Sequence, residues 1–202
     1  MLILATFVFA ESAFAQTAFV QGGIALDIRR FSGPPEDRVF DGNVSTVMIG
    51  VGGHLTSMIS AGVEFDTGRD LVVAPTNSVT IAGRPETITT TYTSKRQAVS
   101  ALFGLHSPGS HKVRVSTYAG LAFTALRRRI TTTAPAIVLS AQPPPTEFTD
   151  LAATPIVGVD VSAAITRKLA IVGVMRAQAL TFGSELHGFS VRPGAGVRVS
   201  FP

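Results

Sequence analysis

The sequence contains no cysteine and no tryptophan, and only two of its 202 residues are tyrosine. The absence of cysteine excludes a disulfide scaffold and a thiolate metal site. Charged residues make up only 15% of the chain, and the mean hydropathy is +0.36, which is apolar for a soluble protein. Beyond the first residues, no stretch approaches the roughly 18 consecutive apolar residues that a membrane-spanning helix needs. This combination leaves a membrane β-barrel or a very apolar soluble β-protein.

The start of the chain has the composition of a secretory signal peptide. Residues 2–10 form a short apolar run, and residues 13–15 match the A-x-A cleavage pattern. A run of about 7–15 apolar residues is the length of a signal-peptide core and is too short to span a membrane. No lysine or arginine follows Met1, so we expect the true translation start to lie upstream. We predict that residues 1–15 are a signal peptide and that residues 16–202 form one barrel domain.

The rest of the chain is dominated by segments in which apolar residues alternate with polar or small ones. Side chains of a β-strand point alternately to its two faces, so each such segment has one apolar and one polar face. Eight segments show the pattern, at residues 22–30, 46–52, 59–66, 91–106, 113–124, 157–165, 169–178 and 187–201. The polar faces are too small or too charged for a soluble sheet packed on a core. The pattern predicts an all-β fold, an eight-stranded antiparallel up-and-down transmembrane β-barrel with its apolar face toward lipid.

The connections between these segments alternate in length. Short connections lie near residues 53–54, 107–111 and 166–168, and long ones at residues 31–42, 68–90 and 131–149. Outer-membrane barrels have short periplasmic turns and longer external loops, so we expect both termini in the periplasm. The threonine-rich connection at 68–90 is expected to extend the strands beyond the membrane.

Charged residues on the polar faces are expected to form a network inside the barrel. Its predicted members are Asp27, Glu64, Asp66, Arg96, Arg114, Asp160, Arg176, Arg192 and Arg198. An isolated ion in a confined lumen of low dielectric constant is costly, so these groups must be paired. The order of the strands makes Asp27 and Arg192 candidate partners, and likewise Arg96 with Glu64 or Asp66. Asp160 and Arg114 lie on adjacent strands, with Arg198 near the same end, and the cluster is a firmer expectation than any one pair. Such a network either plugs a closed barrel or gates an ion path.

Four residues interrupt the regular strand pattern. Leu102, Val172 and Val174 are apolar where a polar or small residue is expected. Pro193 has no N–H group to donate, and a closed barrel has no edge strand on which to place it. We therefore expect a bulge or a position at the barrel rim at Pro193.

The chain resembles the eight-stranded outer-membrane proteins of the OmpA/OmpX type, the outer membrane protein β-barrel domain family, over roughly residues 17–201. The ending GAGVRVSF, with Gly196, Val199 and Phe201, is similar to the assembly signal of that family. The chain departs from the family pattern in its extra Pro202, in Gly194 and in a sparse aromatic girdle. The resemblance implies a location in the bacterial outer membrane of the Gram-negative envelope and recognition by the barrel-assembly machinery. It also implies contact with outer-membrane lipids and lipopolysaccharide, and we expect a monomer.

Motifs for other chemistry are missing. The sequence has no phosphate-binding loop, nucleotide fingerprint or paired catalytic carboxylates, and its positive charge is dense only at residues 127–129. We therefore expect no cofactor, no metal and no nucleic-acid partner. His54, His106 and His111 are expected to be solvated residues of periplasmic turns.

The predicted function is a structural or surface-interaction role with a closed or very narrow lumen, and with the external loops as the surface for a partner. The first alternative is a small solute or ion channel of the porin type, gated by the arginine–carboxylate cluster. A lipid A-modifying enzyme is a third hypothesis, since Glu185, His187 and Ser190 resemble the residue set of the deacylases. The spacing of three places His187 and Ser190 on opposite strand faces, so we expect no enzyme. A soluble lipocalin-like carrier would need the apolar face inside.

Overall fold

The computed structural model describes residues 17–32, 38–81, 83–107, 112–135, 143–183 and 186–201. Ten β-strands account for most of these residues: β1 (Thr17–Ser32), β2 (Gly42–His54), β3 (Ile59–Gly68), β4 (Leu71–Val73), β5 (Thr76–Ile81), β6 (Arg84–His106), β7 (Val113–Thr133), β8 (Thr146–Ala164), β9 (Leu169–Phe182) and β10 (Leu186–Phe201). A helix of membrane-spanning length and hydropathy does not occur in this described part of the chain. The predicted signal peptide at residues 1–15 lies outside the described residues.

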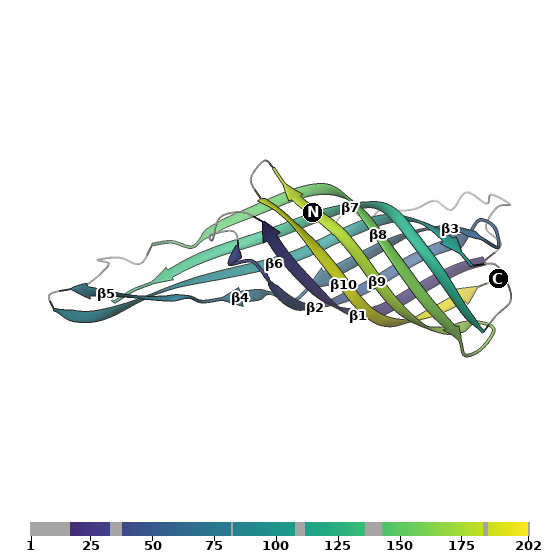
Figure 1. Ribbon diagram of the computed structural model, residues 1–202, viewed down its shortest axis with the longest axis horizontal. Coiled ribbons are helices and arrows are strands. Elements are labelled where there is room, and N and C mark those ends of the chain that lie inside the picture. The colour runs from purple at the N-terminus through teal and green to yellow at the C-terminus, as the bar shows by residue number, and fades with distance from the viewer. Residues whose placement is uncertain are drawn as a thin grey trace.

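Eight of the strands close into an antiparallel barrel (Figure 1). Around the barrel they follow the order β3, β2, β1, β10, β9, β8, β7 and β6, and β6 pairs with β3 to close the ring. Along the chain, each of these strands pairs with the next one, and β1 pairs with β10. The predicted eight-stranded antiparallel up-and-down barrel is confirmed.

The strands form because their residues alternate between the two faces of the barrel wall. On β7, Leu121 and Phe123 are exposed on the outside, whereas Ser116 and Ala122 are buried inside. The other barrel strands repeat the pattern, so the outer surface is aliphatic and the interior contains the charges. A lipocalin-like carrier has the opposite arrangement, so that alternative is wrong.

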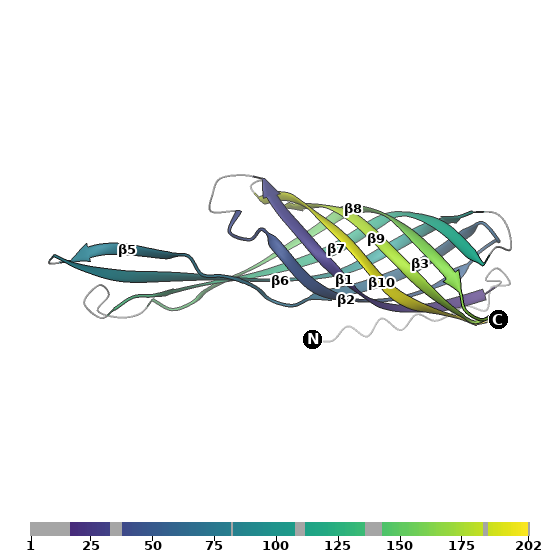
Figure 2. The ribbon, with the colours of Figure 1, turned by 60° about the horizontal axis from the view of Figure 1, so that its bottom comes forward.

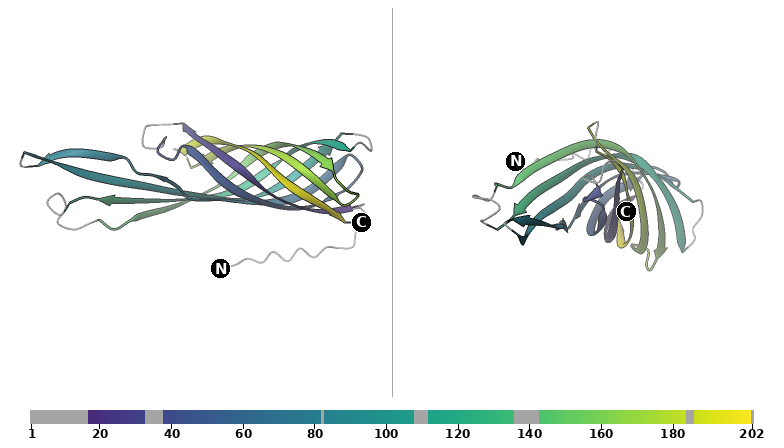
Figure 3. Two further views of the ribbon diagram at one scale, coloured as in Figure 1. Left: turned by 90° about the horizontal axis from the view of Figure 1, so that it is seen from below. Right: turned by 60° about the vertical axis from the view of Figure 1, so that its left-hand side comes forward.

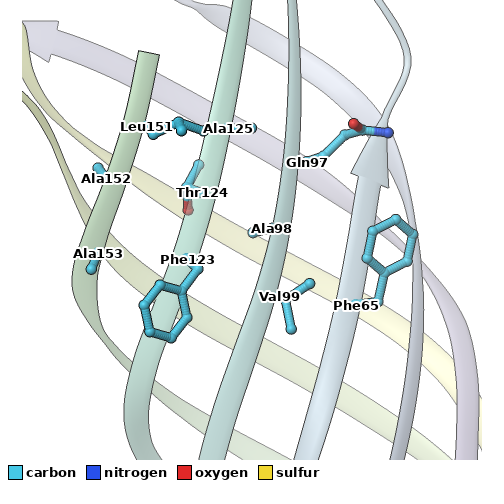
Figure 4. A pocket seen from close by; sticks show the side chains of 10 residues that line it. All are labelled: Phe65, Gln97, Ala98, Val99, Phe123, Thr124, Ala125, Leu151, Ala152 and Ala153. Atoms are coloured by element: carbon cyan, nitrogen blue, oxygen red, sulfur yellow. The ribbon is translucent and has the colours of Figure 1, made fainter. Parts of the chain in front are cut away.

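The exposed apolar side chains form a belt of membrane-spanning length. A tilted transmembrane strand needs about 9–11 residues, which is the length of β7 from Val113 to Phe123. Lys112 and Arg127 bound the apolar stretch on its two sides. Phe65, Val99 and Phe123 lie next to one another on neighbouring strands of this belt, around a shallow apolar groove of about 470 Å³ (Figure 4).

The two ends of the barrel differ. The turn end, as we call it, contains the three short connections His54–Ile59, His106–Val113 and Ala164–Leu169, together with the start of β1 and the end of β10 (Figure 2). The opposite end, the loop end, contains the long connections. In outer-membrane barrels the short turns face the periplasm, so we expect the turn end to be the periplasmic end.

At the loop end, three barrel strands continue as a twisted extension that leaves the barrel (Figures 1 and 3). We call this extension the outer sheet; it consists of β4, β5 and residues 84–94 of β6, 127–133 of β7 and 146–150 of β8. β6 pairs with β4 and β5 on one side and with β7 on the other. The expectation that residues 68–90 extend the strands is confirmed.

Pro193 lies in the middle of β10 without a bulge, so the predicted bulge or rim position is wrong. Pairing with β1 keeps one register on both sides of the proline, from Ala25↔Gly194 to Ile28↔Val191. The two intervening pairs are missing from that ladder, while pairing with β9 continues through Pro193↔Met175. The barrel therefore accommodates the missing N–H group by a local gap in one ladder.

Candidate functional site

The lumen contains a charge network whose half nearer the loop end is organised around Asp66. One carboxylate oxygen of Asp66 accepts a hydrogen bond of 2.6 Å from Nη1 of Arg96, and the other accepts one from Nη1 of Arg192. Asp66 extends from β3, Arg96 from the adjacent β6 and Arg192 from β10. All three side chains are fully buried. The predicted Asp66–Arg96 pair thus forms, with a second arginine added from another part of the barrel wall.

Asp27 is the other acid of this half. Its Oδ2 lies 3.4 Å from Nη1 of Arg96 and 3.1 Å from Nε of Arg29, and Ser190 donates a hydrogen bond to its Oδ1. The ion pair of Asp27 with Arg192 that strand order suggests does not form among the described residues. Arg29 is fully buried and was missed as a network member, although it alternates on the same face as Asp27.

The half nearer the turn end is a chain of ion pairs across the lumen. Glu64 accepts a hydrogen bond of 3.0 Å from Arg176, which also donates one of 2.6 Å to Asp160. Glu64 is on β3 and Arg176 on β9, and these strands are directly opposite each other in the ring. Asp160 in turn accepts a hydrogen bond of 2.7 Å from Arg198. The side chains therefore tie opposite walls of the barrel together.

Arg114 is the one predicted member that the structure leaves outside the network. Asp160 pairs with Arg176 and Arg198, and Arg114 forms no ion pair with any described residue. Of the two arginines that the sequence places near Asp160, Arg198 therefore pairs with it and Arg114 does not. Arg114 is partly exposed and lines a pocket at the turn end instead.

Neutral polar and apolar side chains fill the space between the charges. The Oε1 atom of Gln178 accepts a 2.7 Å hydrogen bond from Arg96, and its Nε2 donates to Thr124 and Thr154 at 2.6 and 2.9 Å. Gln178 could not be singled out from the sequence, because its role depends on which side chains reach it across the lumen. Among these luminal groups, a cavity lined in part by Glu64 and Arg176 has a volume of about 30 Å³, on the order of one water molecule.

Apolar layers close the lumen further. Leu102, Val172 and Val174, which interrupt the sequence alternation, point inward and are buried. Val172 and Val174 pack with Ala25 and Met48. Leu102 packs with Tyr118, Ala122 and Ile156 in a second layer, and a third layer near the loop end consists of Phe31, Phe40, Leu126, Leu180, Phe182 and Leu186. The interior is thus a packed core that contains charges. At the level of Asp66, the side chains of Asp66, Arg96 and Arg192 have no solvent exposure, so the described residues leave no continuous opening through the barrel there.

The histidines at the turn end are partly inside the barrel. His106 is only 3% exposed, and its Nδ1 lies 2.7 Å from the hydroxyl oxygen of Ser116. The His54 ring packs against that of His106 with centroids 4.7 Å apart. The prediction of solvated turn residues is wrong for His106, and His111 lies outside the described residues. Within the described ranges, no three metal-ligating side chains gather in one place.

The residues compared with the lipid A deacylases do not meet. His187 is exposed on the outside of β10, and Ser190 is buried in the lumen, where it donates to Asp27. This is the separation that the spacing of three predicts. Glu185 lies outside the described residues.

The residues of the predicted assembly signal lie at the turn end of β10. Val199 pairs with Val20 and Phe201 with Ala18 on β1, and the Phe201 side chain is exposed on the lipid-facing surface. Gly196 lies against Gly23 of β1, where a side chain would contact the main chain of Gly22. Recognition by the assembly machinery stays a prediction.

Comparison with protein-family models, and with curated protein sequences, finds no match. Comparison with solved structures does find the fold. The Neisserial surface protein A aligns with a TM-score of 0.54 and 15% identity, over 90% of this chain and 96% of that protein. The attachment invasion locus protein Ail of Yersinia pestis aligns with a TM-score of 0.57 and 11% identity, over 90% and 97% of the two chains. A second structure of Ail, in complex with the heparin analogue sucrose octasulfate, aligns with a TM-score of 0.50 and 12% identity, over the same shares. The chain has the OmpA/OmpX-like fold of bacterial outer-membrane β-barrels.

Proposed function

We propose that this outer-membrane barrel is a non-conducting platform that presents its outer sheet to a partner outside the cell. The barrel would be surrounded by outer-membrane lipids and lipopolysaccharide at its apolar belt. The partner would present an extended polypeptide segment and would bind by main-chain hydrogen bonds to a free strand edge. The observation that carries the proposal is the outer sheet itself, whose two outermost strands are each paired on one side only.

The free edges are β5 on one side of the outer sheet and the start of β8 on the other. β5 pairs with β6 alone, and residues 146–150 of β8 pair with β7 alone, because pairing of β8 with β9 begins at Ile156. The side chains of Thr76, Asn77 and Ser78 on β5 are exposed. An exposed strand edge presents unpaired N–H and C=O groups and is a template for an added strand. These edges therefore support binding of an extended peptide.

The filled lumen supports a surface role over transport. Asp27, Asp66, Arg96 and Arg192 have no solvent exposure, and the ion pairs hold opposite walls together. A gate would need an alternative arrangement that opens a path through both the charges and the apolar layer above them. The similar solved structures include proteins named for the cell surface and for attachment, which agrees with a surface role.

The proposal is tested by removing the tip of the outer sheet while the barrel is kept. The N–H group of Thr90 donates to the carbonyl oxygen of Pro75 at 3.2 Å, so the strands are already paired there. Deleting residues 76–89 and joining Pro75 to Thr90 through Asn-Gly closes a two-residue hairpin at this point. Cells that display either chain are tested for retention on immobilised fibronectin, laminin, collagen and heparin.

We expect cells with the intact chain to be retained on at least one of the polypeptides, and the deletion to reduce retention by about tenfold or more. The reason is that several main-chain hydrogen bonds of about 0.5–1.5 kcal/mol each are lost together. The deleted segment contains one arginine, Arg84, and one glutamate, Glu86, so net charge is unchanged. The Lys112→Gln variant, which changes a residue at the turn end, is the control for the amount of protein that the cells display. Equal retention of the deleted and intact chains, with both barrels folded, would contradict binding at the β5 edge, and retention on heparin alone would contradict the proposal as a whole.

A further inference from the structure

A pocket of about 200 Å³ opens at the turn end, and the side chains around it are strongly basic. It lies between the start of β7, the β8–β9 turn and the end of β10. Lys112, Arg114, Arg167, Lys168 and Arg198 line it, and none of the described residues in its lining has a carboxylate side chain. A concave site lined by charge of one sign concentrates its electric field and attracts the opposite ion.

Of the five basic residues of this pocket, Arg198 pairs with Asp160 at 2.7 Å, and the charge of the other four is not neutralised by the described residues around them. Lys112, Arg114, Arg167 and Lys168 form no ion pair with any of them. The nearby acid Asp160 is already engaged by two arginines of the lumen. This distinguishes the pocket from the basic cluster at the loop end, where Arg128 pairs with Asp150 at 2.7 Å and Arg129 lies 3.6 Å from Glu147.

The inner wall of the pocket is rigid and contains hydrogen-bonding groups. The Arg198 guanidinium is held by Gln21, whose Oε1 accepts from Nε at 2.9 Å and from Nη2 at 2.6 Å. It also lies over the ring of Phe19, with 4.8 Å between Cζ and the ring centroid. The hydroxyl of Ser162 lies at the wall, and the buried Nδ1 of His54 has no hydrogen-bond partner among the described residues. Arg198 also donates to Asp160 at 2.7 Å, so it is fixed in place, and its Nη1 is the group that forms none of these hydrogen bonds and can donate to an anion.

We propose that the turn-end pocket binds a small anion with a phosphate group. Arginine donates two parallel hydrogen bonds to phosphate oxygens, and lysine adds compact positive charge, so this set of side chains matches phosphate better than a singly charged halide. The volume is below the roughly 300–1,000 Å³ of pockets for drug-sized ligands, which points to a phosphate with a small substituent. Because we expect the turn end to be the periplasmic end, the source would be a free phosphate ester or the headgroup of an anionic phospholipid.

The test measures anion binding to the refolded full chain in an alkyl glucoside detergent, which contains no phosphate. Inorganic phosphate and glycerol 3-phosphate are titrated by calorimetry at low ionic strength, against sodium chloride of matched ionic strength. The pocket variant combines Arg114→Gln with Lys168→Gln. The control combines Arg84→Gln with Arg127→Gln, which removes the same charge at the loop end. Heat modifiability on gels verifies that each variant is folded.

We expect both phosphates to bind the intact protein, and the pocket variant to bind at least about tenfold more weakly, because charge-assisted hydrogen bonds are lost. The control is expected to be unchanged. A second outcome assigns the lipid headgroup as the source. In that case free phosphates do not bind, but the unfolding temperature is higher in nanodiscs with phosphatidylglycerol than in nanodiscs with phosphatidylcholine alone. The pocket variant then loses this increase. Absence of both effects, or equal losses in the two variants, would overturn the proposal.

Discussion

Replacing Asp66 with alanine is expected to lower the free energy of unfolding by about 3–5 kcal/mol. Asp66 is the shared acceptor of Arg96 and Arg192, and none of the three side chains is exposed to solvent. Its removal leaves two guanidinium groups buried with too little negative charge, since Asp27 already serves Arg29 as well as Arg96. An unpaired buried charge is much more costly than the loss of a solvated ion pair. The charge network therefore makes a single carboxylate decisive for barrel stability.

The measurement is urea unfolding in lipid vesicles, followed by the fraction of protein that migrates as the folded band on unboiled gels. Glu147→Ala provides the matched control, because Glu147 and Arg129 are both more than half exposed and lie 3.6 Å apart. An exposed pair of this kind contributes about 0–1 kcal/mol. If Asp66→Ala costs no more than Glu147→Ala, the lumen is hydrated and the description of it as a packed interior is wrong.

Replacing Gly120 with alanine is expected to destabilise the barrel by about 1–3 kcal/mol or more. Gly120 on β7 faces the lumen opposite Leu102 of β6. A Cβ atom at this position would overlap the main-chain carbonyl oxygen of Ala101. Main chain cannot move aside by a rotamer change, so the β6–β7 ladder must shift, and the shift spreads to the side chains of the lumen.

Gly22→Ala is the matched control for this substitution. Gly22 lies on the outer face of β1, and a Cβ atom there would meet no atom within 4 Å. Alanine also has less conformational entropy to lose than glycine, which favours the folded state by about 0.4–1 kcal/mol. The two changes are thus expected to have opposite signs in the same urea experiment. Equal effects would show that tight packing of β6 against β7 does not limit stability.

The faces of the strands could be predicted from the sequence, because side-chain direction in a strand has a period of two residues. The same rule explains the apparent exceptions: Leu102, Val172 and Val174 keep the period and point inward, into apolar layers that fill the barrel. What was wrong there was the assumption that every inward position is polar. In a narrow barrel the lumen is a core, and a core accepts apolar side chains.

Strand order predicts the Asp66–Arg96 pair, but most other partners of the luminal charges could not be predicted from it. Barrel strands tilt and shift relative to one another, and long arginine side chains reach past their neighbours. Arg176 therefore meets Glu64 across the lumen, and Arg192 meets Asp66 instead of Asp27. Arg114, at the turn end, has no acid left to pair with. His106 lies inside the barrel because it continues the inward face of β6 two residues after Gly104, although its position before a short turn indicated a solvated residue.

The measurement that tests the central claim most directly is single-channel conductance of the refolded protein in planar bilayers. A barrel filled by ion pairs and apolar layers is expected to insert without stepwise openings, at any voltage at which the bilayer itself is stable. Stable openings of uniform size, altered by Glu64→Gln or Asp27→Asn, would show instead that the charge network gates a path, and the protein would then be a channel.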